Sequence, residues 1–510
     1  MTGRANGRAT ASDTAIRART NAGRLSGRWE GEVAVFRGIP FAAPPVGALR
    51  WRPPAAPARW DGERPAYDFG PAPLQPQPPR DSIMYHANFA DRRALVMSED
   101  CLYLNVWTPE PGGGGLPVMV WIHGGGNRYG HGGQEIHDGR SLARRGVVVV
   151  TLNHRLGALG FLAHPALAAE DDLGASGNYG LLDIVAALTW VQENIAHFGG
   201  DPARVTLAGN SAGAAHICHL MASTMARPLF RAAIGQSASG IGRAEGPLPD
   251  QAAAQRQGLS WAREFGAAGG FGDPDIAGLR RTDGVELVLK GHFGPVVDGR
   301  ALTAPSDDVF AAGHQHPVPL LVGTNSDEGS VYATLDAVRR LPVEPGTDEL
   351  YPLRDGDQVR RTARRFTGES RFTYPVWHWA RAHSAVAPTW LYRFTRTPPL
   401  PPDLEVAPPR DGLPGYGVFH TAELPYALDN LAARPWPWSE ADRSLARTMA
   451  DTWVRFIETG DPNGVGAAPS WPRFTGAEAM VFGGEAAPVE LGHVERLDAM
   501  RLLASLPRPL

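Results

Sequence analysis

Five short runs of apolar residues recur along the chain, and each is followed by turn-forming or polar residues. Within a run the apolar side chains are nearly continuous instead of alternating with polar ones, which is typical of strands buried on both faces of a parallel sheet. The runs are Pro117–His123, Gly146–Leu152, Arg204–Ala208, Pro317–Gly323 and Thr389–Phe394. They predict five strands in the interior of a mostly parallel sheet.

Helical periodicity is found between these runs. Apolar residues repeat at offsets of three and four over Asp183–Phe198 and over Asp442–Thr459, which is followed by Gly460-Asp461-Pro462 as a stop signal. Strands that alternate with helices indicate an α/β fold with helices on both faces of the central sheet. Residues 396–415 contain too many prolines for a helix or a central strand, so they predict a long surface loop.

Composition limits the class of protein. The 510 residues carry a formal net charge of −4, which gives no reason to expect a nucleic-acid partner. No run of 18 apolar residues exists, so we expect no transmembrane helix and no membrane partner. Two cysteines, Cys101 and Cys218, provide neither a disulfide framework nor a zinc site, and the cytosol is the expected location.

The chain has one expected boundary. Residues 1–24 contain five arginines but no apolar segment of the kind that a secretory signal needs, and we interpret them as a flexible N-terminal tail. No clear linker and no internal repeat divides residues 25–510, although their length would allow more than one domain. We therefore expect a single domain over 25–510, of unknown oligomeric state.

The strongest local signal is the pentapeptide Gly209-Asn210-Ser211-Ala212-Gly213. It lies between the predicted strand Arg204–Ala208 and a helix-like segment, Ala214–Met221. This is the context of a nucleophile elbow, in which a sharp strand-to-helix turn exposes the serine hydroxyl above the sheet. The start of the helix would supply free N–H groups where an oxyanion forms. The alternative interpretation is an ordinary tight turn.

A second signal, His123-Gly124-Gly125-Gly126, directly follows another predicted strand and precedes Ser211 in the chain. A turn of this kind can direct backbone N–H groups toward a carbonyl under attack, although a flexible glycine turn is an equal alternative when it is taken alone. A serine nucleophile also needs a base and an orienting acid, in the chain order Ser, acid, His. Composition leaves open whether the acid is Asp327 or Glu328, and which of the 16 histidines is the base.

Several ordered motifs resemble type-B carboxylesterases of the carboxylesterase/cholinesterase family, in particular bacterial para-nitrobenzyl-esterase-like members. The resemblance covers about residues 27–490. Its motifs are FRGIPFAAPPVG at 36–47, SEDCLYLNV at 98–106, NYGLLD at 178–183, FGGDP at 198–202 and GDPN at 460–463.

The resemblance implies an α/β-hydrolase fold and carries roles onto matching residues. Ser211 would be the nucleophile, Glu328 the acid and His420, within the string FHTAELPY, the base. The oxyanion hole would consist of the backbone N–H groups of Gly125, Gly126 and Ala212.

Three residues depart from the family pattern. Asn210 stands where the family usually has glutamate, so we expect no buried carboxylate beside the base, and a base that is less easily protonated. Cys101 has no partner 25–30 residues earlier and is expected to be a free, buried thiol. That stretch also lacks tryptophan, so the cholinesterase aromatic site for quaternary ammonium is missing. Arg128 could line the pocket or point to solvent, and we favour solvent.

These observations predict a serine carboxylic ester hydrolase that acts on small-molecule esters and needs no metal or cofactor. One alternative is a different acyl chemistry on the same triad, such as amide or carbamate cleavage or acyl transfer to another alcohol. Another is a catalytically silent binding protein on the same fold, which the intact Ser211, Glu328 and His420 disfavour.

Overall fold

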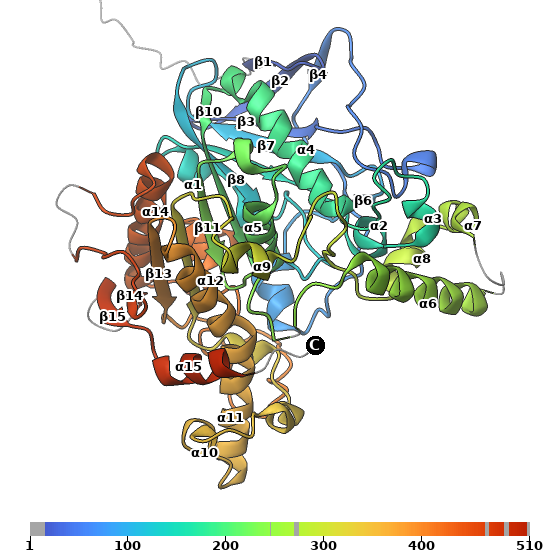
Figure 1. The fold of residues 1–510 in the computed structure, drawn as a ribbon. Coiled ribbons are helices and arrows are strands. Elements are labelled where there is room, and N and C mark those ends of the chain that lie inside the picture. Colours follow the sequence, from blue (N-terminus) through green and yellow to red (C-terminus); the bar gives the residue numbers. More distant parts are fainter. Residues whose placement is uncertain (1–15, 245, 270–274, 465–468, 484–488, 507–510) are drawn as a thin grey trace, which may run out of the picture.

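One large sheet forms the centre of the molecule (Figure 1), and the computed structural model describes residues 16–244, 246–269, 275–464, 469–483 and 489–506. Within them the sheet has thirteen strands in the order β1-β2-β3-β7-β9-β8-β10-β11-β12-β13-β14-β15, with β4 paired to β2. The strands are β1 (Ile16–Arg19), β2 (Arg24–Glu30), β3 (Val33–Pro40), β4 (Glu63–Pro65), β7 (Tyr103–Thr108), β8 (Leu116–Ile122), β9 (Val148–Leu152), β10 (Gly200–Asn210), β11 (Ala232–Gln236), β12 (Leu320–Asn325), β13 (Thr389–Phe394), β14 (Glu478–Phe482) and β15 (Val489–His493). A separate parallel pair consists of β5 (Ala72–Pro73) and β6 (Met97–Ser98).

In sheet order, the strands β9, β8, β10, β11, β12, β13 and β14 all run parallel to one another. On either side of them, β1, β2, β3, β7 and β15 join the sheet mainly as antiparallel partners. Parallel strands all end at the same edge of a sheet. The segments that follow β8, β10, β12 and β13 therefore begin at one edge, which is the usual place for a site in an open α/β sheet.

All five predicted strands are present, and the prediction of an α/β-hydrolase fold with a mostly parallel sheet is confirmed. The boundaries differ where backbone hydrogen bonding dictates it. The run that begins at Pro317 becomes strand only from Leu320, because proline has no N–H to donate to the ladder. The run over Arg204–Ala208 is the centre of the longer strand β10.

Side chains of the central strands alternate between two cores. Along β8, Val118 and Val120 pack into one apolar cluster, whereas Met119 and Trp121 pack into the other. Helices α4, α5 and α12 contribute to the first cluster, and α1, α13 and α14 contribute to the second. Helices thus cover both faces of the sheet (Figure 1), which explains why these strands are apolar at every position.

The helices of the described residues are short except for α4, α6, α11 and α14. They are α1 (Arg140–Ala143), α2 (Gly157–Phe161), α3 (Pro165–Ala168), α4 (Tyr179–Asn194), α5 (Ala212–Ala222), α6 (Gln251–Gly269), α7 (Ile276–Arg281), α8 (Gly284–Leu289), α9 (Ser306–Ala311), α10 (Thr347–Leu350), α11 (Gly356–Gly368), α12 (Tyr374–Ser384), α13 (Leu424–Ala427), α14 (Glu440–Thr459) and α15 (Leu497–Ser505).

Both predicted long helices are confirmed as α4 and α14. Helix α14 begins at Glu440 because Ser439 and Asp442 form a reciprocal capping box. It ends at Gly460, whose φ of 77° is the left-handed conformation that glycine adopts without penalty. Residues 396–415 contain no helix or strand, as their proline content predicts.

The expected boundary of the N-terminal tail is too late. Ile16–Arg19 already form β1, which pairs with β2 in antiparallel register. A four-residue edge strand that contains two arginines has no apolar run to mark it, so the sequence pattern does not reveal it. Residues 1–15 of the predicted tail lie outside the described residues, and a single domain for the rest of the chain stays a prediction. In the described part of the chain, no helix is both long enough and apolar enough to span a membrane.

Candidate active site

Ser211 is held in a strained turn between β10 and α5. Its φ of 54° and ψ of −128° lie outside the regions that residues with a side chain normally occupy, and such strain persists only where the surroundings enforce it. The glycines on either side allow this turn. A Cβ on Gly213 would lie 2.1 Å from the Ile122 carbonyl oxygen, and one on Gly209 would lie 2.7 Å from the same oxygen. The pentapeptide is therefore a strand–turn–helix elbow that places Ser211 at the end of β10.

The glycine turn after β8 lies directly against this elbow. A Cβ on Gly124 would lie 3.0 Å from the Ser211 Cβ. Gly125 and Gly126 both have positive φ, at 118° and 62°. Among the described residues, none accepts a hydrogen bond from the backbone N–H of Gly125, Gly126 or Ala212. N–H groups without an acceptor in the described structure can stabilise a negative charge that develops on an oxygen of a ligand.

His420 and Glu328 form a buried pair. The side chains are both 1% exposed, and His420 Nδ1 donates to Glu328 Oε2 over 2.6 Å. Since a carboxylate accepts this bond, Nδ1 carries the proton of the neutral ring and Nε2 is left as the acceptor. Nε2 is buried and has no hydrogen-bond partner within the described residues. Phe372 and Tyr332 pack against the imidazole at centroid distances of 4.6 and 5.6 Å, which fixes the ring.

The structure distinguishes the two acidic residues that the sequence leaves open. Glu328 follows β12, and its second oxygen accepts the backbone N–H of Asn325 over 2.8 Å, so both carboxylate oxygens are held. Asp327 does not contact His420. Its carboxylate accepts the backbone N–H of Val418 over 3.0 Å and so fixes the loop that carries His420.

Ser211 and His420 line the same cavity, of about 1000 Å³, together with the glycine turn and Ala212. Its walls include aliphatic side chains and aromatic ones such as Phe89, Phe293 and Phe372. This volume is at the upper end of the range for small-molecule sites. The cavity can therefore take a sizeable ligand with its reactive group at Ser211.

Comparison with known proteins identifies the family. A carboxylesterase family model matches residues 13–348 and 346–493. The chain belongs to the carboxylesterase family. It is 39% identical over 506 residues to a fumonisin B1 esterase of Sphingopyxis macrogoltabida, covering 91% of this chain and 86% of that protein. It is 33% identical to the para-nitrobenzyl esterase of Bacillus subtilis, covering 89% and 92%. The fold is similar to that of a carboxylesterase of Geobacillus stearothermophilus, with a TM-score of 0.79, 31% identity and coverage of 96% and 99%. This carboxylesterase is therefore an enzyme that hydrolyses carboxylic esters.

The expectation that no buried carboxyl group lies near the base is wrong. Glu423, three residues after His420, is completely buried. It accepts hydrogen bonds from the amides of Asn210 over 3.0 Å, Gln236 over 3.1 Å and Asn325 over 2.5 Å. Burial, and next the charge of Glu328, raise the pKa of the Glu423 carboxyl above its usual value, and the Asn325 amide opposes them. Asn210 thus serves as a donor to a carboxyl group that the chain supplies from another segment.

The expectation for Arg128 is also wrong. The side chain lines the cavity of the carboxylesterase, and its Nε is buried without a hydrogen-bond partner among the described residues. The chain turns back at Gly125, whose carbonyl accepts the backbone N–H groups of Arg128 and Tyr129, and Arg128 is half-buried at the cavity. Cys101 is a buried free thiol, as predicted, and burial raises its pKa well above the usual value.

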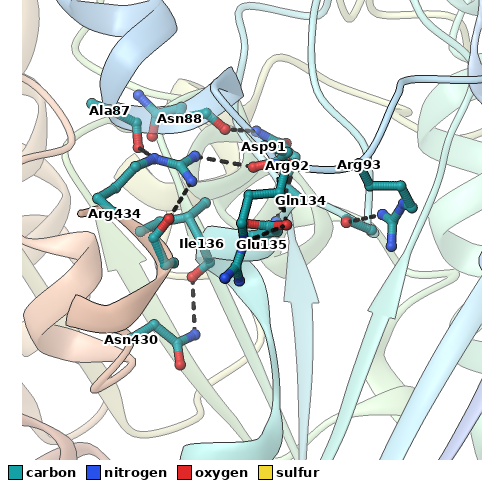
Figure 2. Close-up of polar contacts among 12 residues, drawn as sticks. Ala87, Asn88, Asp91, Arg92, Arg93, Gln134, Glu135, Ile136, Asn430 and Arg434 are labelled. Carbon is teal, nitrogen blue, oxygen red and sulfur yellow. Dashed lines mark hydrogen bonds and ion pairs between the residues drawn. The ribbon is translucent and has the colours of Figure 1, made fainter.

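The segment around Asn88 forms one wall of the cavity. Because Cys101 forms no disulfide, polar contacts hold this segment (Figure 2). Arg434 has a side chain that is only 1% exposed; its Nε donates to the Ala87 carbonyl over 2.9 Å and its Nη2 to Asp91 over 3.1 Å. Gln134 donates to the Asn88 carbonyl over 2.8 Å. The Asn88 amide in turn donates to the Thr421 hydroxyl, next to His420, over 2.9 Å.

Sequence reasoning did not identify Glu423, Gln236, Arg434 or Asn88. Glu423 lies in the string FHTAELPY, three residues after His420, and this position could have indicated it. Arg434 is one of many arginines, and no pattern around it distinguishes it. In the ranges that the structure describes, no cluster of three or more His, Cys, Asp or Glu side chains could hold a metal ion.

Replacing Asn210 with aspartate should destabilise the fold in a pH-dependent way. Asn210→Asp exchanges a donor to Glu423 for a second carboxyl group of the same size, and two facing carboxyl groups cannot both ionise at low cost. The pair therefore binds an extra proton in the folded state. The penalty is full at pH 8 and is lost as pH falls through the raised folded pKa.

The measurement is the melting temperature of wild type and Asn210→Asp between pH 5 and pH 8. The difference in melting temperature between wild type and Asn210→Asp should widen as pH rises. At pH 8 the double variant Asn210→Asp/Glu423→Gln should melt closer to wild type than Asn210→Asp does. A gap that is constant with pH would show that the two groups do not interact.

Removing the Arg434 charge should loosen the cavity wall. Arg434→Met leaves Asp91 partly buried and unpaired and frees the Ala87 carbonyl, for which a loss of about 3–5 kcal/mol is expected. Asp91→Asn in the same chain should recover part of the loss. Arg92→Met is the matched control, since Arg92 is 80% exposed in its pair with Glu135 and should cost about 0–1 kcal/mol.

Urea unfolding at pH 7 measures the free energy of unfolding of each variant. KM for a p-nitrophenyl ester shows whether the cavity wall has changed. An Arg434→Met protein as stable as Arg92→Met, with an unchanged KM, would contradict this role.

Proposed function

We propose that ester hydrolysis by this carboxylesterase proceeds through an acyl-enzyme on Ser211, with His420 as the base and Glu328 as its orienting acid. The observation that carries the proposal is the buried 2.6 Å bond from His420 Nδ1 to Glu328, which leaves an unpartnered Nε2 beside the cavity that Ser211 lines. A base in this tautomer, held by a carboxylate, is what a serine nucleophile requires.

In the first half-reaction, the Ser211 oxygen bonds to the ester carbonyl carbon while its proton moves to His420 Nε2. The carbonyl π electrons move onto oxygen, which becomes the oxyanion of a tetrahedral intermediate. When the intermediate collapses, the bond to the alcohol oxygen breaks, and His420 returns the proton to the departing alcohol. An acyl group then remains on Ser211.

The oxyanion accepts hydrogen bonds from the N–H groups of Gly125, Gly126 and Ala212. Their lack of other acceptors in the described structure supports this role. By analogy with a measured donor, losing one such group costs about 2.7–4 kcal/mol of barrier. These donors are in place before reaction, because the glycine turn and the elbow pack against each other.

In the second half-reaction, water attacks the acyl carbonyl as His420 takes its proton. A second tetrahedral intermediate forms on the same three donors. Its collapse breaks the bond to the Ser211 oxygen, which recovers the proton from His420, and the carboxylic acid leaves. The mechanism uses side chains, backbone N–H groups and water.

Each single substitution in the triad should abolish most of the activity, and the losses should not be additive when substitutions are combined. Ser211→Ala, His420→Ala and Glu328→Gln should each lower kcat by about 10⁴-fold or more, because the three residues act as a unit. A triple variant should be little worse than Ser211→Ala. Asp327→Asn is the matched control, since Asp327 contacts the His420 loop and not the imidazole.

The measurements are p-nitrophenyl ester hydrolysis and labelling by a fluorophosphonate, which should modify wild type but not Ser211→Ala. Matched p-nitroanilides distinguish ester from amide hydrolysis. If Asp327→Asn lost activity and Glu328→Gln kept it, the assignment of the acid would be wrong.

A further inference from the structure

More arginines than acidic residues line the cavity of this enzyme. Among the described residues that line it, four are arginines, namely Arg128, Arg243, Arg371 and Arg410, whereas Asp81 is the one acidic residue. Charges of one sign in a cleft raise the local concentration of ligands of the opposite sign. Binding of a neutral ester would not require this arrangement.

Arg128 is the arginine closest in the chain to the proposed oxyanion hole, three residues after Gly125. Its Nη2 lies 3.5 Å from the Leu289 carbonyl oxygen, and its guanidinium carbon lies 5.8 Å from the centre of the Tyr129 ring. Its Nε is buried without a hydrogen-bond partner among the described residues, and Arg128 forms no ion pair with a described carboxylate. A buried donor without an acceptor is costly, so a group from outside the chain would stabilise it.

His216 is a second polar group of the cavity without a partner. It lies on α5, five residues after Ser211, and is 1% exposed. Neither ring nitrogen is hydrogen-bonded within the described residues, while Phe161 stacks on the ring at 5.7 Å. Burial lowers its pKa to about 3, so it offers a neutral donor and an acceptor to a ligand.

We propose that the substrates are carboxylic esters that carry a further, free carboxylate, and that Arg128 binds this carboxylate. The proposal rests on the proposed function, since it concerns the substrate of the same site. A planar guanidinium matches a carboxylate through parallel N–H···O bonds and remains charged at every working pH. His216 then binds a neutral polar group of the same ligand.

Two pairs of esters test the proposal, and within each pair a carboxamide replaces the free carboxylate. The first pair carries the charge on the acid part, as the mono-4-nitrophenyl ester of adipic acid and its carboxamide counterpart. The second pair carries it on the alcohol part, as the butyrate ester of 6-hydroxyhexanoic acid and the corresponding amide. Nitrophenolate release follows the first pair and a pH-stat follows the second.

We expect wild type to prefer the anionic member of at least one pair by about 10-fold or more in kcat/KM. The preference should fall by about 10- to 100-fold in Arg128→Gln and should weaken with added NaCl in wild type. Arg128→Lys keeps the charge but lacks the planar fork, so it should retain part of the preference. Arg501→Gln, which removes a side chain that is 67% exposed outside the cavity, is the control and should leave the ratio unchanged.

Equal kcat/KM within both pairs would overturn the proposal, and so would a preference that Arg128→Gln retains. Should Arg128→Gln fail to fold, the salt dependence in wild type and the ratio in Arg128→Lys decide. The proposed function is tested separately by the carboxamide esters. If wild type hydrolyses them and Ser211→Ala does not, the mechanism stands whatever the charge preference is.

Discussion

Two backbone turns in direct contact determine the geometry of this enzyme. The turn after β8 and the turn after β10 meet so closely that a methyl group on Gly213 would overlap the Ile122 carbonyl, and one on Gly124 would crowd Ser211. The contact exists because β8 and β10 are adjacent and parallel, so their carboxyl ends coincide. It brings the glycine turn into contact with the strained Ser211. Glu328 and His420 are brought to the same edge by β12 and by the loop that follows β13.

A second constraint is the number of carboxyl groups that one buried site can hold. The Glu328 carboxylate accepts the hydrogen bond of His420 Nδ1, and Glu423 lies near enough for the Glu328 charge to raise its pKa. The amides of Asn210, Gln236 and Asn325 supply donors that stabilise the Glu423 carboxylate. A third carboxyl group at position 210 would compete for these donors and add repulsion. Asn210 is therefore a consistent partner of Glu423 in this chain, and its amide keeps the network satisfied.

The central strands and the elbow could be predicted from the sequence because their signals are local, whereas Glu328 and His420 could be singled out only through the resemblance to the carboxylesterase family. Continuous apolar runs mark β8, β9 and β13, and the glycines around Ser211 mark a turn that tolerates no side chain. Contacts between distant segments leave no such pattern. Asn210 and Glu423 are 213 residues apart, and Arg434 and Asp91 are 343 apart. That Arg128 lines the cavity likewise depends on segments far from it in the chain, and β1 is recognisable as a strand only through its pairing with β2.

A hydrogen bond connects the cavity wall around Asn88 to the loop that carries His420. Arg434 binds the segment around Ala87 and Asp91, and Asn430 binds the carbonyl of Ile136 (Figure 2). Asn430 also binds the carbonyl of Asp138, and Asn88 binds Thr421. Thr421 has a φ of 77° and directly follows His420, so strain at this residue is maintained partly by the wall. In a protein whose wall was closed by a covalent bridge, the wall could keep its place independently of these side chains. Here the position of the wall depends on buried hydrogen bonds, and one of them, from Asn88 to Thr421, also holds the loop that carries His420. Disturbing the wall is therefore expected to alter the chemical step as well as substrate binding, because both depend on one network.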